Sequence, residues 1–160
     1  MSHIHIDKVF KTYPGDPPVQ ALQDIHLDIA PGEFVALLGP SGCGKSTLLN
    51  IAAGLLVPDE GTMRIGDVTL RPGARVQPPR AGYVFQSPRL LNWMTVAQNI
   101  AFGLEVQKRP KAEIALTVDQ LLDLLHLKDF RDRFPKDLSG GMRQRVAIAR
   151  VLALDSPIML

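Results

Sequence analysis

The stretch Gly39-Pro-Ser-Gly-Cys-Gly-Lys-Ser-Thr47 decides the fold of this chain. It has the pattern G-x-x-x-x-G-K-[ST], in which glycines let the backbone bend sharply and approach a ligand closely. The apolar run at residues 34–38 predicts a strand covered on both faces of a parallel sheet, and residues 45–53 predict a helix that Gly54 ends. A strand, this loop and a helix in succession predict a phosphate-binding loop, because its N–H groups and the helix N-terminus point at an anion.

The loop predicts a nucleoside triphosphate as the ligand. Lys45 would contact the β- and γ-phosphates, and the Ser46 hydroxyl would bind Mg²⁺. Cys43 fills an unspecified position of the pattern, so we expect it to have no catalytic role. The candidate nucleotide-binding residues of the stretch are Gly39, Pro40, Ser41, Gly42, Cys43, Gly44, Lys45, Ser46 and Thr47. The motif occurs in GTPases, kinases, helicases and transport ATPases, so it leaves the function open.

Outside this loop, the first half of the chain predicts short strands. Alternating apolar and polar residues predict half-buried strands at residues 4–6, 25–29 and 62–65. Residues 83–85 are a continuous apolar run and predict a second strand covered on both faces. Residues 71–80 predict a Pro-rich loop.

The second half of the chain predicts helices. They are expected at residues 95–106, 111–127 and 139–153, with Ser139 as the N-cap of the last. An apolar strand begins again at Ile158. Strands, then helices, then a strand predict an α/β core with a helical insertion.

Composition excludes several classes of protein. The 160 residues carry a net charge of +2, so charge gives no support to nucleic-acid binding. The single cysteine cannot form an internal disulfide, and the N-terminus has no signal-peptide pattern. No stretch reaches the roughly 20 apolar residues of a membrane span. His3, His5, His26 and His126 lack metal-ligand spacing and are expected at the surface.

A second motif, Leu138-Ser-Gly-Gly-Met142, places glycines at a helix start. Its exposed N–H groups would form another anion-binding N-terminus. Taken alone, it favours an ordinary capped helix in which Ser139 accepts a hydrogen bond from the Met142 amide. At this distance after a phosphate loop, however, it resembles the signature motif of ABC-type ATPases, with Met142 where the usual form has Gln.

The resemblance implies ATP and Mg²⁺ as cofactors and assigns roles to further residues. The signature residues Leu138, Ser139, Gly140, Gly141 and Met142 would close over the γ-phosphate of a nucleotide bound to the partner subunit. Gln86 would contact Mg²⁺ and the attacking water, which makes Lys45 and Gln86 the catalytic candidates and Ser46 and Gln86 the metal ligands. Tyr13 would stack on adenine. Without the resemblance, Gln86 fits a polar strand terminator and Tyr13 fits ordinary packing.

The resemblance covers essentially the whole chain and implies its domain organisation. The fold class is α/β: a P-loop NTPase core with an N-terminal antiparallel β subdomain and an inserted helical subdomain. Residues 1–160 would form a single ABC-type nucleotide-binding domain, with 1–87 and 141–160 in the ATP-binding core and 88–140 in the helical subdomain. The family's Asp-Glu pair after the last apolar strand has no counterpart here. We therefore expect a C-terminally incomplete domain that hydrolyses ATP weakly or not at all.

Residues 90–96 resemble importers of nitrate, sulfonate, taurine and related solutes, with Asn92 in place of Pro. Trp93 in this stretch either packs the helical subdomain or contacts a partner. The parent protein would hydrolyse ATP to power import of such a solute. Its partners would be a second copy or a paired nucleotide-binding subunit, transmembrane permease subunits and, through them, a periplasmic or extracellular solute-binding protein, with no nucleic acid. It would be cytoplasmic and peripheral on the inner face of the membrane.

Other functions stay open as alternatives. A soluble ABC-type ATPase of DNA repair or translation usually carries long coiled-coil or tandem-domain insertions, which are absent here. A GTPase or nucleotide kinase is disfavoured, because no Asn-Lys-x-Asp motif occurs. An inactive nucleotide-binding fragment is the third alternative.

Overall fold

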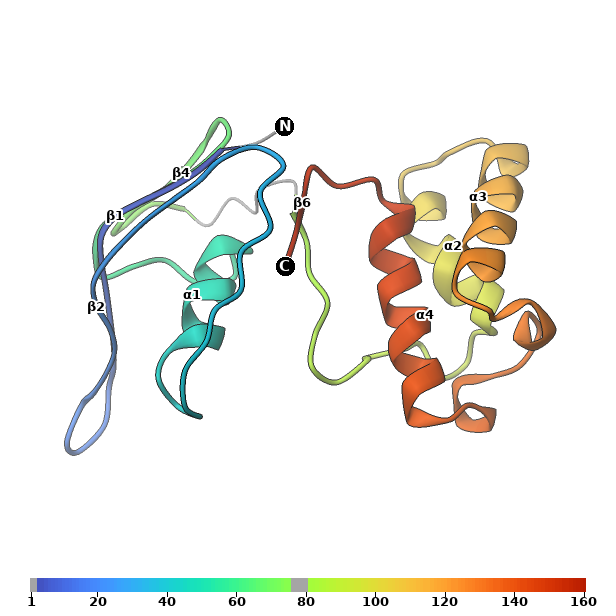
Figure 1. The fold of residues 1–160 in the computed structure, drawn as a ribbon, viewed down its shortest axis with the longest axis horizontal. Coiled ribbons are helices and arrows are strands. Elements are labelled where there is room, and N and C mark those ends of the chain that lie inside the picture. Colours follow the sequence, from blue (N-terminus) through green and yellow to red (C-terminus); the bar gives the residue numbers. More distant parts are fainter. Residues whose placement is uncertain (1–2, 76–80) are drawn as a thin grey trace. The chain divides into compact units, whose positions relative to one another are not determined.

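The computed structural model describes residues 3–75 and 81–160. The chain divides into two compact units, shown in Figure 1: the sheet unit, residues 1–81 with Leu160, and the helical unit, residues 82–159. The Pro-rich loop expected at 71–80 falls partly outside the described residues, and residues 71–75 are neither helix nor strand.

The sheet unit contains a four-stranded antiparallel sheet. Its strands are β1 (Ile4–Tyr13), β2 (Val19–Ile29), β3 (Glu60–Ile65) and β4 (Val68–Leu70), in the order β2-β1-β3-β4. Ile4 pairs with Ile29 on one side and with Ile65 on the other, and Ile4 and Ile65 are buried. The alternation at residues 4–6, 25–29 and 62–65 therefore predicted real strands, which extend further than the sequence pattern indicated.

One glycine allows β3 to start close against β1. Gly61 has φ 77°, and a Cβ there would lie 2.0 Å from the carbonyl oxygen of Lys8. Only glycine fits this approach without displacing the backbone of β1.

Helix α1 (Lys45–Ala52) lies on one side of this sheet (Figure 1). It buries Thr47, Leu48 and Ile51, and Ile51 is fully buried. Gly54 follows with φ 68° and ends the helix, as predicted.

The strands expected to be covered on both faces do not form. Residues 34–38 are in no strand, and Phe34 and Leu38 are 94% and 92% exposed. Of the run that leads to residues 83–85, only Ala81–Gly82 forms a strand, β5, which pairs with β6 (Ile158–Met159). A continuous apolar run forms a strand only when neighbouring strands supply hydrogen bonds, and residues 34–38 pair with none in the described chain.

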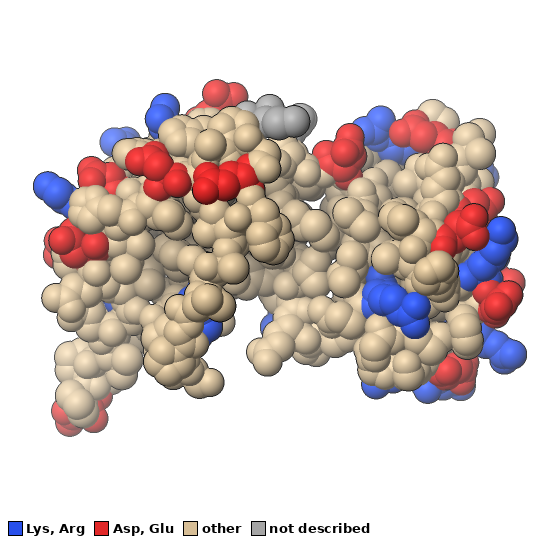
Figure 2. Space-filling model, in the orientation of Figure 1, with Lys and Arg blue, Asp and Glu red and all other residues tan. Residues whose placement is uncertain are grey.

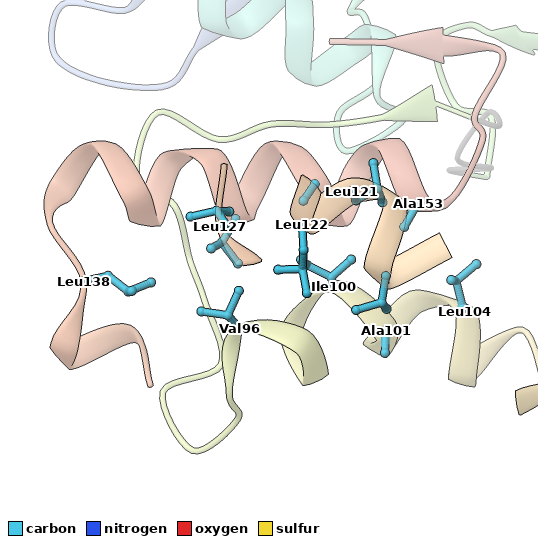
Figure 3. Packing of buried hydrophobic residues seen from close by; sticks show 12 residues of the cluster. Val96, Ile100, Ala101, Leu104, Leu121, Leu122, Leu127, Leu138 and Ala153 are labelled. Atoms are coloured by element: carbon cyan, nitrogen blue, oxygen red, sulfur yellow. The ribbon is translucent and has the colours of Figure 1, made fainter. Parts of the chain in front are cut away.

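The helical unit is built from α2 (Val96–Val106), α3 (Lys111–Leu124) and α4 (Gly140–Ala153). Short 3₁₀ turns η1 (Lys128–Phe130) and η2 (Pro135–Asp137) connect α3 to α4. Figure 3 shows apolar side chains of these elements pointing toward one another. The buried cluster is Val96, Ile100, Ala101, Leu104, Val118, Leu121, Leu122, Leu127, Leu138, Val146, Ala149 and Ala153. Because α4 shares this core with α2 and α3, it belongs to the helical unit from its first turn to its last.

Local capping fixes where two of these helices begin. The Thr95 side chain accepts from the Gln98 amide while the Gln98 side chain accepts from the Thr95 amide. Ser139 Oγ accepts from the Met142 amide over 3.3 Å. The predicted starts are confirmed, whereas α3 ends three residues before the predicted Leu127, because His126 turns into the left-handed region (φ 53°) and Leu127 enters the core.

Asn99 is a fully buried polar residue on α2 that orders the loop before it. Its side chain accepts from the Leu91 amide and donates to the carbonyl oxygens of Leu91, Met94 and Thr95 over 2.9–3.1 Å. Trp93 in this loop is 73% exposed, so the interpretation that it packs the helical subdomain is wrong.

No helix in residues 3–75 and 81–160 combines the length and apolar character that crossing a bilayer needs. On the face shown in Figure 2, basic and acidic side chains are interspersed. The described residues visible there form no extended area of one charge.

Candidate functional site

The phosphate loop, residues 39–47, is an open turn that leads directly into α1. Gly44 is the N-cap residue of α1 and has no side chain to bond the first-turn amides. The first turn also contains no acidic residue. The N-terminus of α1 therefore offers its N–H groups and partial positive charge to an external anion.

Gly44 is the position where the loop most needs glycine. Its φ is 94°, and a Cβ there would lie 2.2 Å from the carbonyl oxygen of Ala21 and 2.9 Å from a methyl carbon of Leu22. The loop thus turns into α1 while pressed against β2. Steric contact with β2 therefore explains why glycine occupies the position before Lys45.

The Lys45 side chain folds back onto the loop that precedes it. Nζ donates to the carbonyl oxygens of Gly39 (2.8 Å) and Pro40 (2.7 Å) and lies 3.4 Å from the Cys43 sulfur. Ser46, the next residue, is exposed in the first turn of α1. The loop thus combines a cation, open amides and an exposed hydroxyl, which is a donor set suited to phosphate oxygens.

Tyr13 lies at the end of β1 and is tied to the helix that follows the phosphate loop. Its hydroxyl is 3.3 Å from Oγ1 of Thr47, which is buried on α1. The structure therefore brings Tyr13 and the phosphate loop together, although they are far apart in the sequence. The Thr47 hydroxyl contacts Tyr13, a partnership that the sequence motif alone did not indicate.

Gln86 lies in the helical unit, in an irregular segment, and its side chain is exposed. The prediction that it ends a strand is wrong, because β5 stops at Gly82. Within the surrounding residues 85–89, the Gln86 segment, the Arg89 guanidinium lies 4.2 Å from the centre of the Phe85 ring. The Arg150 guanidinium donates to the Arg89 carbonyl oxygen over 2.8 Å.

The signature loop, residues 138–142, forms the exposed start of α4. Leu138 is buried and anchors the loop, while Ser139, Gly140 and Gly141 are exposed. A Cβ at Gly141 would meet nothing within 4 Å. The fold itself therefore leaves space for a Cβ at this glycine.

The candidate residues fall into two groups that belong to different units. Tyr13 and the phosphate loop lie in the sheet unit, and Gln86 and the signature loop lie in the helical unit. Within residues 3–75 and 81–160, no three His, Cys, Asp or Glu side chains are arranged to hold a metal ion. A cation at the phosphate loop would therefore need oxygen atoms from the molecule bound there as well as from Ser46.

Sequence reasoning missed Arg150. It is a basic residue on the side of α4 that also carries the buried Val146 and Ala153, at positions i−4 and i+3. A charged residue on the buried face of a helix is the signal that could have identified it, since such a group needs a polar partner.

Comparisons with known proteins show what this chain resembles in sequence and in structure. The sequence model of a family described as "ABC transporter" matches residues 22–160. The chain is 52% identical to the sulfate/thiosulfate import ATP-binding protein CysA of Gloeobacter violaceus, over 98% of this chain and 44% of the relative. It is 48% identical to the taurine import ATP-binding protein TauB of Roseobacter denitrificans, over 92% of this chain and 53% of the relative. The chain thus spans about half the length of the curated relatives it matches.

Among solved structures, the chain is similar to the dimeric post-hydrolysis state of the ATP-binding cassette MJ0796, which holds ADP and Pi. The TM-score is 0.87 at 35% identity, over 98% of this chain and 72% of the other. This likeness confirms the predicted α/β fold class.

Proposed function

The chain belongs to the ABC transporter family, and we propose that it binds ATP through its phosphate loop and powers solute import across a membrane. The observation that carries the proposal is the loop itself. The Lys45 ammonium, the uncapped start of α1 and the exposed Ser46 hydroxyl all belong to this one short loop and the first turn that follows it. Such a loop fits the polyphosphate of a nucleotide.

Lys45, Tyr13 and Ser46 of the sheet unit each bind a different part of the nucleotide. Lys45 exchanges the carbonyl oxygens of Gly39 and Pro40 for β- and γ-phosphate oxygens, since an ammonium binds charged acceptors more strongly. Tyr13 offers its ring to the adenine. Ser46 holds Mg²⁺ together with phosphate oxygens, and a bound Mg²⁺ neutralises phosphate charge. The exposed position of Ser46 fits this role.

Gln86 and the signature loop of the helical unit act at the γ-phosphate of a nucleotide. Gln86 orients the water and the metal at the γ-phosphate, and the signature loop covers the nucleotide of a paired subunit. The open space at Gly141 supports such an approach. We assign residues 1–87 and 141–160 to the ATP-binding core and residues 88–140 to the helical subdomain of one nucleotide-binding domain, a division by role that differs from the packing of α4 against α2 and α3 in the helical unit.

ATP hydrolysis, the partners and the location are further parts of this proposal. The partners are a second copy or paired subunit, membrane-spanning permease subunits and a solute-binding protein, with the chain on the inner face of the membrane. The solute is nitrate, a sulfonate, taurine or a related small solute. The relatives' names mention sulfate, thiosulfate and taurine, which supports taurine or a related sulfur-containing solute within this group. Co-purification with a multi-spanning membrane protein is expected; isolation without one, from membranes of the source cells, would contradict the role in transport.

Lys45→Ala tests the nucleotide site directly. Loss of a charged donor to phosphate costs about 1.5–3 kcal/mol, so we expect ATP affinity to fall at least about tenfold. A titration with a fluorescent ATP analogue and Mg²⁺ measures the change. Lys111→Ala is the matched control, because Lys111 is also the first residue of a helix and is exposed. Equal affinities for the two variants would overturn the proposed site.

A further inference from the structure

Helix α4 carries arginines that donate to main-chain carbonyl groups outside the helix. Arg150 donates to the Arg89 carbonyl oxygen over 2.8 Å, and Arg145 donates to the Leu125 carbonyl oxygen over 2.9 Å. The two contacts are alike in chemistry but fix different segments. Arg145 holds the end of α3, whereas Arg150 holds the Gln86 segment.

The Gln86 segment is attached to α4 at both of its ends. Gln144 Nε2 lies 3.5 Å from the Phe85 carbonyl oxygen, a weaker contact than the one from Arg150 to Arg89. Between these points Gln86 is exposed. Arg89 itself is in the left-handed region with φ 45°, a conformation that a non-glycine residue keeps only when its surroundings hold it.

The hydrogen bond from Arg150 can keep Arg89 in this conformation. The guanidinium is only half-exposed, and burial lowers the pKa of Arg150. Arginine nevertheless stays charged in proteins, so a partly buried guanidinium needs an acceptor. The Arg89 carbonyl oxygen is that acceptor, at 2.8 Å.

We propose that Arg150 is a positioning residue for Gln86 and makes the Gln86 segment move as one body with α4. The helix that holds this segment begins at the signature loop. Ser139 and Arg150 are about 16 Å apart along the helix axis. A displacement of the Gln86 segment is therefore transmitted to the signature loop through a rigid helix. The inference rests on the proposed function only for the roles of Gln86 and the signature loop toward nucleotide.

Hydrogen–deuterium exchange on the 160-residue chain tests the attachment without any nucleotide. Arg150→Met is expected to speed amide exchange in residues 86–90 about tenfold, because a charged hydrogen bond that closes the segment is lost. Arg145→Met removes the matched contact and is expected to leave residues 86–90 unchanged. Equal exchange in these residues for the two variants would overturn the proposal.

Arg150→Lys provides a second variant if Arg150→Met does not fold. Lysine can still donate to the Arg89 carbonyl, so exchange in residues 86–90 is expected to lie between wild type and the fully released segment. Exchange identical to wild type in Arg150→Lys and Arg150→Met would contradict the role of the side chain. If Arg150→Met does not fold, Arg150→Leu also removes the donor and takes its place, and exchange in residues 86–90 identical to wild type in Arg150→Leu decides against the proposal.

The effect on nucleotide is measured separately. With the Gln86 segment released, the gain in ATP affinity on adding Mg²⁺ is expected to shrink in Arg150→Met and to persist in Arg145→Met. A wild-type chain that binds no ATP would defeat the proposed function while the exchange result still stands. A chain that binds ATP, with equal Mg²⁺ effects in both variants, would defeat the positioning role.

Discussion

Gly44 shows how one residue sets the geometry of the phosphate loop. It combines φ 94° with a backbone oxygen 2.2 Å from the place of a Cβ, whereas Gly42 has φ 83° with open space around it. Gly44→Ala is therefore expected to lose about 3 kcal/mol of unfolding free energy, from strain and overpacking together. Gly42→Ala should lose about 1 kcal/mol from strain alone.

Urea denaturation of both variants measures this difference. A Gly44→Ala chain as stable as Gly42→Ala would show that β2 does not press against the loop as the structure has it. The prediction concerns stability only, so it is independent of whether nucleotide is bound.

The sequence identified individual residues well where their role is local. Ser139 was expected to cap a helix through the Met142 amide, and it does. Arg150 and Asn99 were not found, because their roles depend on carbonyl groups of a different segment or a preceding loop. A pattern of residue types does not show which carbonyl will lie beside a given side chain.

Among the secondary-structure elements, those with local signals were predicted and those that need distant partners were not. Helices α1, α2 and α4 begin within a residue of the expected positions, because caps and glycines act within one turn. Residues 34–38 and 83–85 were expected to be strands and are not. Their apolar character is compatible with a buried strand, but the strand itself depends on neighbours that the local sequence cannot supply.

A carboxylate joins β1 to the start of β3. Asp59 accepts hydrogen bonds from Lys11 Nζ over 2.6 Å and from the Thr12 amide over 2.7 Å. Both hydrogen bonds lower the pKa of Asp59, and the one from Lys11 has the larger effect. A carboxylate with a lowered pKa stabilises the folded state at pH values above its unfolded-state pKa. This stabilisation is lost as the pH falls through its folded-state pKa.

Asp59→Asn is accordingly expected to cost the chain up to about 1 kcal/mol at pH 7, a small amount because the pair is partly exposed. The cost should begin to shrink as pH falls below about 4, the unfolded-state pKa of Asp, and should vanish below the lower pKa of Asp59 in the folded chain, where wild-type Asp59 is protonated. Urea denaturation between pH 7 and pH 3 tests this, with Asp67→Asn as an exposed control. A cost of Asp59→Asn that does not change with pH would contradict the ion-pair account.

As a whole, the molecule carries its candidate residues on two units, and the proposed site is completed by pairing of two copies or subunits. Gly141 is the residue that tests this pairing, because its own fold leaves space for a Cβ. Gly141→Ala is expected to keep or raise stability by roughly 0.5–1 kcal/mol, since alanine favours a helix.

The same variant should pair less in the presence of ATP, because the added methyl group obstructs approach to a partner's nucleotide. Sedimentation velocity with and without Mg-ATP compares wild type and Gly141→Ala. Nucleotide-dependent pairing of equal strength in both would remove the signature loop from the interface.

The central claim is that ATP lies on the phosphate loop at the start of α1. An NMR titration of the ¹⁵N-labelled chain with Mg-ATP tests it most directly, residue by residue. The account predicts that the largest amide shifts occur in residues 42–47, with a smaller shift at Tyr13. Saturating shifts confined to α2 and α3, or no shifts at all, would contradict it.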